Sequence, residues 1–447
     1  MDLLKLLRRN TFEHGIHPAQ YKELTSGLPI RRLPFAPQLV VPLAQHTGNP
    51  AIALVKPGQE VVRGEPIARA DGFFSVPMHA PATGRVETIQ LMPTARGPKT
   101  LSIVLHVYEA SSQEVLYEAP CDLDALDTDQ IIQAVQDSGM VGLGGAAFPT
   151  HVKLKPPAEH RVDILVANGC ECEPYLTCDH RVMLEQTAEL LAGIRIVMRA
   201  LGVERCMIGV EDNKPDAIAA IRAQLPADGR VSVHAVQTKY PQGAEKMLIE
   251  SLLGRQVPSG AFPSAVGVSV FNVGTLAQIG ELLPQGRGII ERVVTVSGPG
   301  VRHPGNYLVP VGTPVRFLLE HAGSTPQAHE LILGGPMMGM SVAALDIPVT
   351  KAVSGMVVLE EAAGSGKTTS RVQPCIRCAW CVEACPMHLN PSTLGLLAMQ
   401  REYARMAEEF HLNDCFECGC CSYVCPANIP LVQYFRIAKA INREQAA

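Results

Sequence analysis

Eight cysteines near the carboxyl end of the chain have the spacing of a metal-cluster ligand set. They form two runs, 375–386 and 415–426, and each run reads Cys-x2-Cys-x2-Cys-x3-Cys-Pro. Four thiolates per run match the four iron corners of a [4Fe–4S] cube, for which this spacing is typical. Zinc favours separated cysteine pairs or Cys with His, and disulfides need an oxidising compartment. The two complete runs therefore predict two [4Fe–4S] clusters.

The assignment of thiolates to clusters follows from the form of each run. We expect one tight loop to supply three thiolates and a helix that starts at the fourth Cys to lead away. In two-cluster ferredoxins the fourth Cys ligates the other cluster. One cluster is thus predicted on Cys375, Cys378, Cys381 and Cys425, and the other on Cys415, Cys418, Cys421 and Cys385. Cys420 lies outside both patterns and is interpreted as a small packing residue.

Two glycine-bearing stretches in the middle of the chain could bind a phosphate or a dinucleotide. The first, 142–150, reads Gly-Leu-Gly-Gly-Ala-Ala-Phe-Pro-Thr and is followed by Lys153 and Lys155. Its backbone N–H groups can converge on a phosphate, although a plain turn is the open alternative. The second, 168–174, reads Asn-Gly-Cys-Glu-Cys-Glu-Pro directly after an apolar strand, where an α/β sheet places its ligands. Its cysteines lack a second pair, so a metal is not expected there.

The composition is that of a water-soluble, multidomain chain. Of its 447 residues, 47% are apolar and 18% are charged, and the net charge of −5 gives no reason to expect nucleic acid as a partner. No apolar run reaches the roughly 18 residues that a membrane span requires. We therefore expect a cytoplasmic protein without a membrane span of its own.

The elements that must position these motifs change character along the chain. Apolar-polar alternation broken by Pro and Gly from 39 to 107 predicts short strands that resemble the barrel-sandwich fold of biotinyl and lipoyl carriers. The stretch 75–79 lacks the carrier Lys, so no carried cofactor is expected. From 131 to 283 strands alternate with helices, including one predicted over 182–201, which indicates a largely parallel sheet. A β-rich unit follows from Glu291, and apolar spacing over 396–410 predicts one amphipathic helix.

Taken together, these motifs resemble the C subunit of the Rnf (Rsx) electron-transport complexes over nearly the whole chain. The resemblance rests on the two Cys runs, on both glycine-bearing stretches, and on four shorter motifs. These are Gly15-Ile-His-Pro18, Pro42-Leu-Ala-Gln-His-Thr-Gly48, Asn272-Val-Gly-Thr275 and Gly334-Gly-Pro-Met-Met-Gly339.

The central part also resembles the flavin subunit of respiratory complex I, which binds FMN and NADH. That resemblance implies FMN contacts at Gly142, Gly144, Gly145, Lys153, Asn168 and Asn272. It implies dinucleotide contacts at Phe148, Glu171, Glu173 and Glu245, with Glu171 and Glu173 orienting the nicotinamide end. Leu143 and Cys170 stand where that flavin subunit has an Arg and an Asp.

The resemblance implies a multidomain α/β fold with six parts. These are an N-terminal arm (1–34), a barrel-sandwich domain (35–120), a Rossmann-like FMN/NADH domain (125–288), a β-grasp module (289–360), a linker (361–372) and a helical two-cluster ferredoxin domain (373–440).

The function that the resemblance implies is exchange of a hydride between NAD(H) and FMN, followed by single-electron transfer through the clusters. The partners would be the other subunits of a membrane complex, including a ferredoxin-like B subunit, and ferredoxin indirectly. The complex would move Na⁺ or H⁺, with this chain on the cytoplasmic side of the inner membrane. A corrinoid reductase of related build and a flavin-free electron-transfer scaffold are the alternatives.

Overall fold

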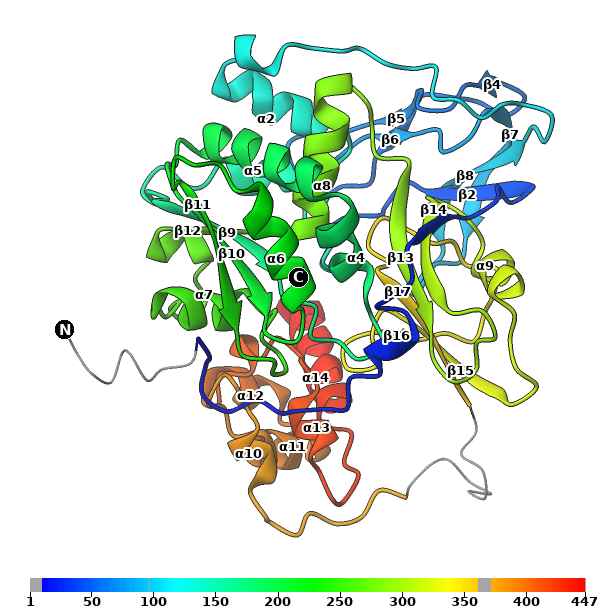
Figure 1. Ribbon diagram of the computed structural model, residues 1–447. Helices are drawn as coiled ribbons and strands as arrows, with labels where there is room; N and C mark the ends of the chain where they lie inside the picture. Colours follow the sequence, from blue (N-terminus) through cyan, green and yellow to red (C-terminus); the bar gives the residue numbers. More distant parts are fainter. Residues whose placement is uncertain (1–9, 96, 361–370, 447) are drawn as a thin grey trace.

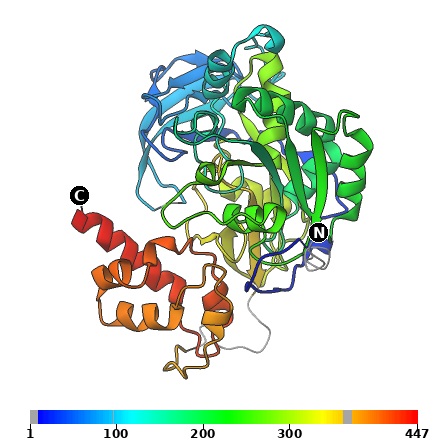
Figure 2. The same cartoon turned by 90° about the vertical axis from the view of Figure 1, so that its left-hand side faces the viewer.

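The computed structural model describes residues 10–95, 97–360 and 371–446. Four structural units follow one another along the chain, and the last one, which carries both Cys runs, projects from the rest (Figure 2). Among the described residues, no helix has both the length and the apolar composition needed to cross a membrane. Most of the predicted linker at 361–372 lies outside the described residues.

The first unit is the expected barrel sandwich of two small antiparallel sheets. One sheet has the order β2 (Gln38–Pro42), β8 (Thr100–Val107), β7 (Gly84–Met92) and β4 (Glu60–Val61). The other has the order β3 (Ile52–Ala53), β5 (Pro66–Arg69) and β6 (Met78–His79). Alternate apolar side chains point inward, so that Leu39, Ile67 and Leu105 are almost fully buried between the sheets.

The second unit is a four-stranded parallel sheet in the order β11-β10-β9-β12. Its strands are β9 (Ile164–Gly169), β10 (Cys206–Glu211), β11 (Val231–Val236) and β12 (Val268–Asn272). Leu165 and Ala167 pack into the main apolar core, whereas Ile164 and Val166 face α7 (Glu245–Leu253) on the opposite side. Both faces of the sheet are therefore covered, as a parallel sheet requires.

Two helices of this unit, α5 (Thr187–Leu201) and α8 (Val273–Leu282), pack with their backbones in close contact. A Cβ atom added to Gly193 would lie 1.8 Å from the carbonyl oxygen of Leu276, so only Gly fits there. The predicted helix over 182–201 is in fact two helices, because α4 (Cys178–Glu185) ends before α5 begins. The Thr187 hydroxyl donates a 2.6 Å hydrogen bond to the carbonyl of Met183, in competition with the regular helical bond.

The remaining helices of the α/β unit are short. They are α2 (Thr128–Asp137), α3 (Thr150–Leu154) and α6 (Pro215–Gln224).

The third unit is a six-stranded sheet in the order β1-β14-β13-β17-β15-β16 with the helix α9 (Val315–Ala322). Its own strands are β13 (Glu291–Ser297), β14 (Gly305–Pro310), β15 (Ala328–Leu333), β16 (Met340–Ser341) and β17 (Gly355–Glu360). The edge strand β1 (Ile30–Arg32) comes from the N-terminal arm and pairs in parallel with β14. Sequence analysis did not predict this pairing, because the three residues Ile-Arg-Arg carry no strand periodicity.

Within residues 371–446, the fourth unit consists of four short α-helices and one long α-helix around the two Cys runs. They are α10 (Trp380–Glu383), α11 (Pro391–Met399), α12 (Tyr403–Glu408), α13 (Cys420–Tyr423) and the long α14 (Leu431–Ala446). The two runs share a backbone conformation, since Ala379 and Gly419 both have left-handed φ angles, 64° and 88°, immediately before α10 and α13. The two Cys runs thus form a structural repeat.

Two sequence predictions for the fourth unit are wrong. The single amphipathic helix expected over 396–410 is divided into α11 and α12, because Arg401 adopts a left-handed φ of 61° between them. Met406 is buried while Met399 is 64% exposed, so the apolar spacing does not mark one continuous face. Moreover, Cys385 and Cys425 do not start helices but follow the ends of α10 and α13.

Candidate functional site

Two asparagines meet at the carboxyl edge of the parallel sheet. Asn168, near the end of β9, lies next to Asn272, which ends β12, and the two residues are register partners. The strand that follows β9 in the chain, β10, lies on one side of it in the sheet, and β12 lies on the other side. The carboxyl edge between β9 and β12 is therefore the topological switch point of the sheet. Open α/β sheets bind their ligands at such a point. The structure therefore brings together two residues that the sequence predicted as FMN contacts.

Both asparagine side chains also hold the local backbone in place. The amide of Asn168 donates to the carbonyl of Gly243 at 2.8 Å and accepts from the N–H of Cys170 at 3.1 Å. Asn272 caps α8 by accepting from the N–H groups of Gly274 and Thr275. Part of their hydrogen-bonding capacity is thus structural, and the sheet edge is rigid before any ligand binds.

The glycine-rich loop lies directly over Asn272. A Cβ atom added to Gly144 would come within 3.5 Å of the Asn272 side chain, and the N–H of Leu143 donates to the hydroxyl of Thr275 at 2.9 Å. Gly145 has a left-handed φ of 104°, and a Cβ atom added to it would meet no other atom within 4 Å. Gly144 and Gly145 are both exposed, so the loop presents bare backbone to open space beside the switch point. This arrangement fits a phosphate-bearing cofactor.

Lys153 and Glu245, predicted to contact FMN and the dinucleotide, pair with each other. Lys153 in α3 makes an ion pair with Glu245, the first residue of α7, and donates to the carbonyl of Val270 at 3.2 Å. Their side chains are 30% and 40% exposed, so a ligand can reach both charges. Phe148, at the end of the loop, is half-buried and its carbonyl accepts from the N–H of Gly142 at 2.8 Å.

The carboxylate of Glu171 is buried against the start of α4. It accepts hydrogen bonds from the N–H of Asp179 at 2.9 Å and the N–H of His180 at 3.3 Å, and from the Cys178 thiol at 3.2 Å. A negative charge is favourable at this helix end. Burial, followed by the charge of Glu171, raises the pKa of Asp179 to about 7. The predicted role of Glu171 at the nicotinamide stays a prediction.

Glu173 connects the sheet edge with the third unit. Its carboxylate accepts hydrogen bonds from the N–H groups of Met337 and Met338 at 2.9 and 2.8 Å. Burial raises the pKa of this carboxyl group to about 7, and the two N–H donors hold it lower than burial alone would. Lys22 of the N-terminal arm fixes the same loop by donating to the carbonyls of Glu173 and Leu176. The sequence offered no signal for this fixation, because Lys22 stands beside Tyr21 and Glu23 in a polar stretch of the arm.

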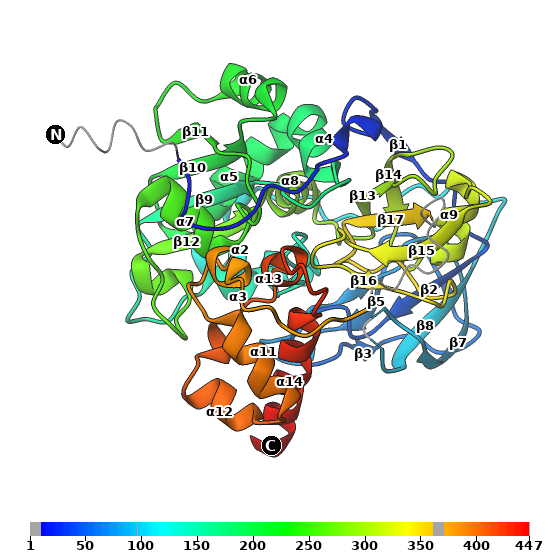
Figure 3. The same ribbon diagram turned by 90° about the horizontal axis from the view of Figure 1, so that it is seen from below.

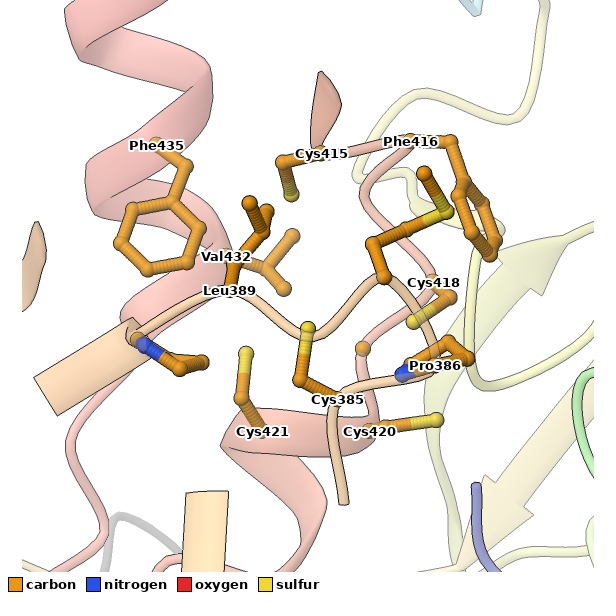
Figure 4. Close-up of a pocket in the computed structure, with 13 residues that line it drawn as sticks. Cys385, Pro386, Leu389, Cys415, Phe416, Cys418, Cys420, Cys421, Val432 and Phe435 are labelled. Carbon is orange, nitrogen blue, oxygen red and sulfur yellow. The ribbon is translucent and has the colours of Figure 1, made fainter. Parts of the chain in front are cut away.

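Four thiols from both Cys runs surround one pocket (Figure 4). Cys385 of the first run lines it together with Cys415, Cys418 and Cys421 of the second. The four sulfur atoms point towards the middle of the pocket, whereas the sulfur of Cys420 points away from it (Figure 4). The apolar side chains of Leu389, Val432 and Phe435 line the rest of the pocket. Four converging thiols without any nitrogen or carboxylate ligand are the donor set of an iron–sulfur cube.

The other four thiols form a second group nearer the surface. Burial raises the pKa of the Cys381 thiol most, and the charges of Cys425, Cys375 and Cys378 raise it further. Cys375 is exposed, and its neighbours Ile376 and Trp380 are 67% and 54% exposed. This donor set also fits a [4Fe–4S] cluster, and it reaches solvent more directly than the first.

A buried apolar cluster joins the sheet edge to the deeper cysteine pocket. Tyr240 and Cys420 are buried in it, and Cys172, Met337 and Cys418 pack against it. In Figure 1, α10 and α13 lie at the bottom of the molecule below the α/β unit, and Figure 3 shows α13 from below with α11, α12 and α14 beside it. Sequence reasoning missed Tyr240, whose only signal was a large apolar residue before Pro241. It quoted Met337 within the motif 334–339 but assigned that residue no contact.

The chain matches four family models in order along its length. They are described as the RnfC barrel sandwich hybrid domain at residues 10–109, the Nuo51 FMN-binding domain at 135–281, the SLBB domain at 293–341 and the 4Fe-4S dicluster domain at 374–429. These matches confirm the predicted fold class. They also confirm FMN and two [4Fe–4S] clusters as the cofactors of this chain.

Two curated relatives match almost the full chain. One is the C subunit of the proton-translocating ferredoxin:NAD(+) oxidoreductase complex of Clostridium ljungdahlii, 41% identical over 97% of this chain and 94% of the relative. The other is the C subunit of the Na(+)-translocating ferredoxin:NAD(+) oxidoreductase complex of Acetobacterium woodii, 40% identical over 97% of each chain. Among solved structures, an NAD+-reducing [NiFe]-hydrogenase aligns with a TM-score of 0.48 and 22% identity, covering 64% of this chain and 55% of that one.

Proposed function

The chain belongs to the family of C subunits of ion-translocating ferredoxin:NAD(+) oxidoreductase complexes, and from that premise we propose the path that electrons take through it. The sheet edge at Asn168 and Asn272 is the site where NAD(H) and FMN meet. The two cysteine groups carry single electrons between that edge and the rest of the complex. When bound, FMN exchanges two electrons with NAD(H) and single electrons with the clusters.

One observation carries this proposal more than any other. The loop that leaves β9 carries Cys172 and Glu173, and Cys172 packs in the same apolar cluster as the cluster-pocket residue Cys418. The proposed flavin edge and the cysteine pocket are therefore joined by packed protein side chains. A site that only bound nucleotide would need no such connection.

The position of each cysteine group supports an order of electron carriers. The pocket formed by Cys385, Cys415, Cys418 and Cys421 is next to the flavin edge, so we assign it the first cluster. The more exposed group of Cys375, Cys378, Cys381 and Cys425 holds the second cluster and faces the partner. The crossed ligation of the two runs is part of this proposal, supported by the convergence of Cys385 with three thiols of the second run.

The site residues have distinct roles in this proposal. Gly142, Gly144 and Gly145 bind phosphate through backbone N–H groups, and the Lys153–Glu245 pair supplies a charge of each sign beside them. Glu173 orients the nicotinamide half of the dinucleotide, because this residue is partly exposed at the junction of the second and third units. Glu171 acts indirectly, since its oxygens hold the start of α4.

The partners follow from the family. The chain is a subunit of a membrane-associated oxidoreductase complex, and we propose that it lies on the cytoplasmic side of the inner membrane, against a ferredoxin-like B subunit. One relative is named for H⁺ translocation and the other for Na⁺ translocation, and this chain is almost equally identical in sequence to both. Sequence similarity to them therefore does not indicate which ion is coupled. The relatives do not favour a corrinoid reductase, the alternative of related build.

The proposal is tested by adding NADH under anaerobic conditions to the purified chain loaded with FMN and clusters. Flavin absorption should fall first, and the iron–sulfur absorption should fall with it. Bleaching of the flavin alone, with the clusters still reducible by dithionite, would contradict the connection between the two sites.

A further inference from the structure

Three potential metal ligands converge where the N-terminal arm meets the fourth unit. They are the carboxylate of Glu13 and the ring nitrogens of His14 and His388, and these atoms lie within 4.8 Å of one another. Glu13 and His14 come from the arm, whereas His388 follows Cys385 by three residues. Within the described part of the chain, this is the one His/Cys/Asp/Glu group whose geometry suits a metal ion outside the Cys runs.

The tautomer of His14 favours metal binding. Its Nδ1 atom lies 2.5 Å from the carbonyl oxygen of Glu383. Because a carbonyl can only accept, Nδ1 must carry the hydrogen, which leaves the lone pair on Nε2 available. Metal-binding histidines are oriented in this way by an outer partner that accepts from the other ring nitrogen.

The two imidazole rings are already arranged like ligands of one ion. Their centres lie 4.5 Å apart and their planes are inclined by 84°. Two imidazoles on one tetrahedral Zn²⁺, with Zn–N bonds of about 2.0 Å, place their ring centres on the order of 5 Å apart. Only a small adjustment of the side chains is therefore needed to bring both nitrogens to the ion.

The ligand atoms are accessible and not used by other groups. Glu13 and His388 are exposed and His14 is partly exposed. Across residues 10–95, 97–360 and 371–446, neither the Glu13 carboxylate nor the His388 ring has a hydrogen bond or an ion pair. The nearby cation Lys239 donates instead to the carbonyl of Phe12 and lies over its ring.

We propose that Glu13, His14 and His388 bind one Zn²⁺ ion, with water in the fourth position. Two nitrogens, one carboxylate oxygen and an open position form a set that Zn²⁺ accepts readily. The ion fastens the arm to the fourth unit, where the N–H of Gly15 already donates to the carbonyl of Ala384 at 3.3 Å. Ile16 follows and packs against the buried Tyr240 and Cys420, so the ion stabilises the contact between the flavin edge and the first cluster.

Zinc and iron are measured together to test this site. The chain with both clusters is dialysed anaerobically against micromolar Zn²⁺, and both metals are then counted by elemental analysis. We expect one Zn²⁺ per chain with no loss of iron, which excludes replacement of cluster iron. His14→Ala and His388→Ala should each weaken Zn²⁺ binding at least tenfold, because the loss of an outer partner alone costs roughly 10- to 100-fold. Glu13→Gln should weaken it less.

His17→Ala is the matched control, since His17 is exposed on the same arm three residues from His14. It should bind Zn²⁺ like the unmodified chain. If a substitution lowers the iron content, His388→Gln replaces it, because Gln keeps the length of the side chain. The proposal is overturned if the unmodified chain binds no stoichiometric Zn²⁺, if Zn²⁺ enters only as iron leaves, or if His14→Ala and His388→Ala bind it as well as His17→Ala does.

Discussion

The phenol hydroxyl of Tyr240 donates a 2.6 Å hydrogen bond to the backbone carbonyl of Cys418. Tyr240 is only 1% exposed and also pairs through its backbone with Ile16 of the N-terminal arm. A side chain of the α/β unit is thus bonded to the loop that carries three of the four converging thiols of the deeper cysteine pocket. This pair of residues therefore joins the α/β unit to the pocket that we propose for the first cluster.

Tyr240→Phe removes that hydrogen bond and leaves the carbonyl of Cys418 without its partner. The loss of one buried hydrogen bond costs about 1 kcal/mol and loosens the contact between the two units. We expect NADH to reduce the flavin at an unchanged rate and the clusters several-fold more slowly, as measured by anaerobic stopped-flow absorption. Tyr307→Phe is the control, because Tyr307 is equally buried and donates to the carbonyl of His303 within the third unit. Equal effects of the two substitutions would contradict a specific role of Tyr240.

Cys385→Ala tests the crossed ligation of the two Cys runs. The sulfur of Cys385 points into the pocket of the second run, so its loss should remove the same paramagnetic species as Cys415→Ala (Figure 4). Cys375→Ala should remove the other species, as seen by electron paramagnetic resonance after reduction. Cys420→Ala is the control and should keep both clusters, since its sulfur points away. If Cys385→Ala matches Cys375→Ala instead, each run holds its own cluster.

Glu173→Gln tests the orientation of the nicotinamide half. The Glu173 carboxylate accepts hydrogen bonds from two backbone N–H groups and, in this proposal, from a donor group of the dinucleotide. A neutral amide has only one acceptor oxygen and cannot accept all three. The KM for NADH should therefore rise about tenfold, while the FMN content stays the same. Burial gives Glu173 a pKa of about 7, so in the unmodified chain the KM should also rise as the pH falls below 7. Steady-state kinetics from pH 6 to 8 should show this dependence lost in Glu173→Gln. An unchanged KM would exclude Glu173 from the site.

Lys351→Met tests how a buried amino group, which lies where the first three units meet, affects the stability of the fold. The Lys351 ammonium is fully buried and donates to the carbonyls of Pro77 and Gly139, and burial lowers its pKa from 10.5 to about 7. The unfolded chain then binds more protons than the folded chain between pH 7 and 10.5, so stability rises with pH in that window. From pH 7 to pH 9 the unmodified chain should gain about 2 kcal/mol relative to Lys351→Met. Thermal unfolding at the two pH values measures the difference, and parallel pH profiles would contradict it.

The sequence was most informative where chemistry requires a fixed spacing. The two Cys runs predicted the cofactors that the dicluster family model supports, and the strand predicted before Asn168 is β9, because such patterns depend on local geometry alone. The individual ligand and flavin contacts stay predictions. The sequence was least informative about contacts between distant segments. The pairing of β1 with β14 and the bond from Tyr240 to Cys418 join residues far apart in the chain, and neither leaves a periodic pattern.

Backbone conformation explains the remaining errors. The apolar residues over 396–410 recur with the period of an α-helix. However, Arg401 has a left-handed φ, so α11 ends before it and α12 begins after it. Gln186 divides the helix predicted over 182–201 in a similar way, because its φ of −125° and ψ of 36° are not helical, and the Thr187 hydroxyl bonds the carbonyl of Met183 beside it. A single side chain with a competing hydrogen bond, or a single residue in an unusual conformation, overrides the average preference of its neighbours.

The central claim is that one chain connects NAD(H) oxidation at the sheet edge with reduction of both clusters. It is tested most directly by anaerobic visible spectroscopy of the purified chain, loaded with cofactors, before and after NADH is added. We expect acid precipitation to release yellow FMN, and NADH to bleach both the flavin and the iron–sulfur absorption in the same sample. A colourless supernatant from cluster-loaded protein, or clusters that NADH leaves oxidised, would contradict it.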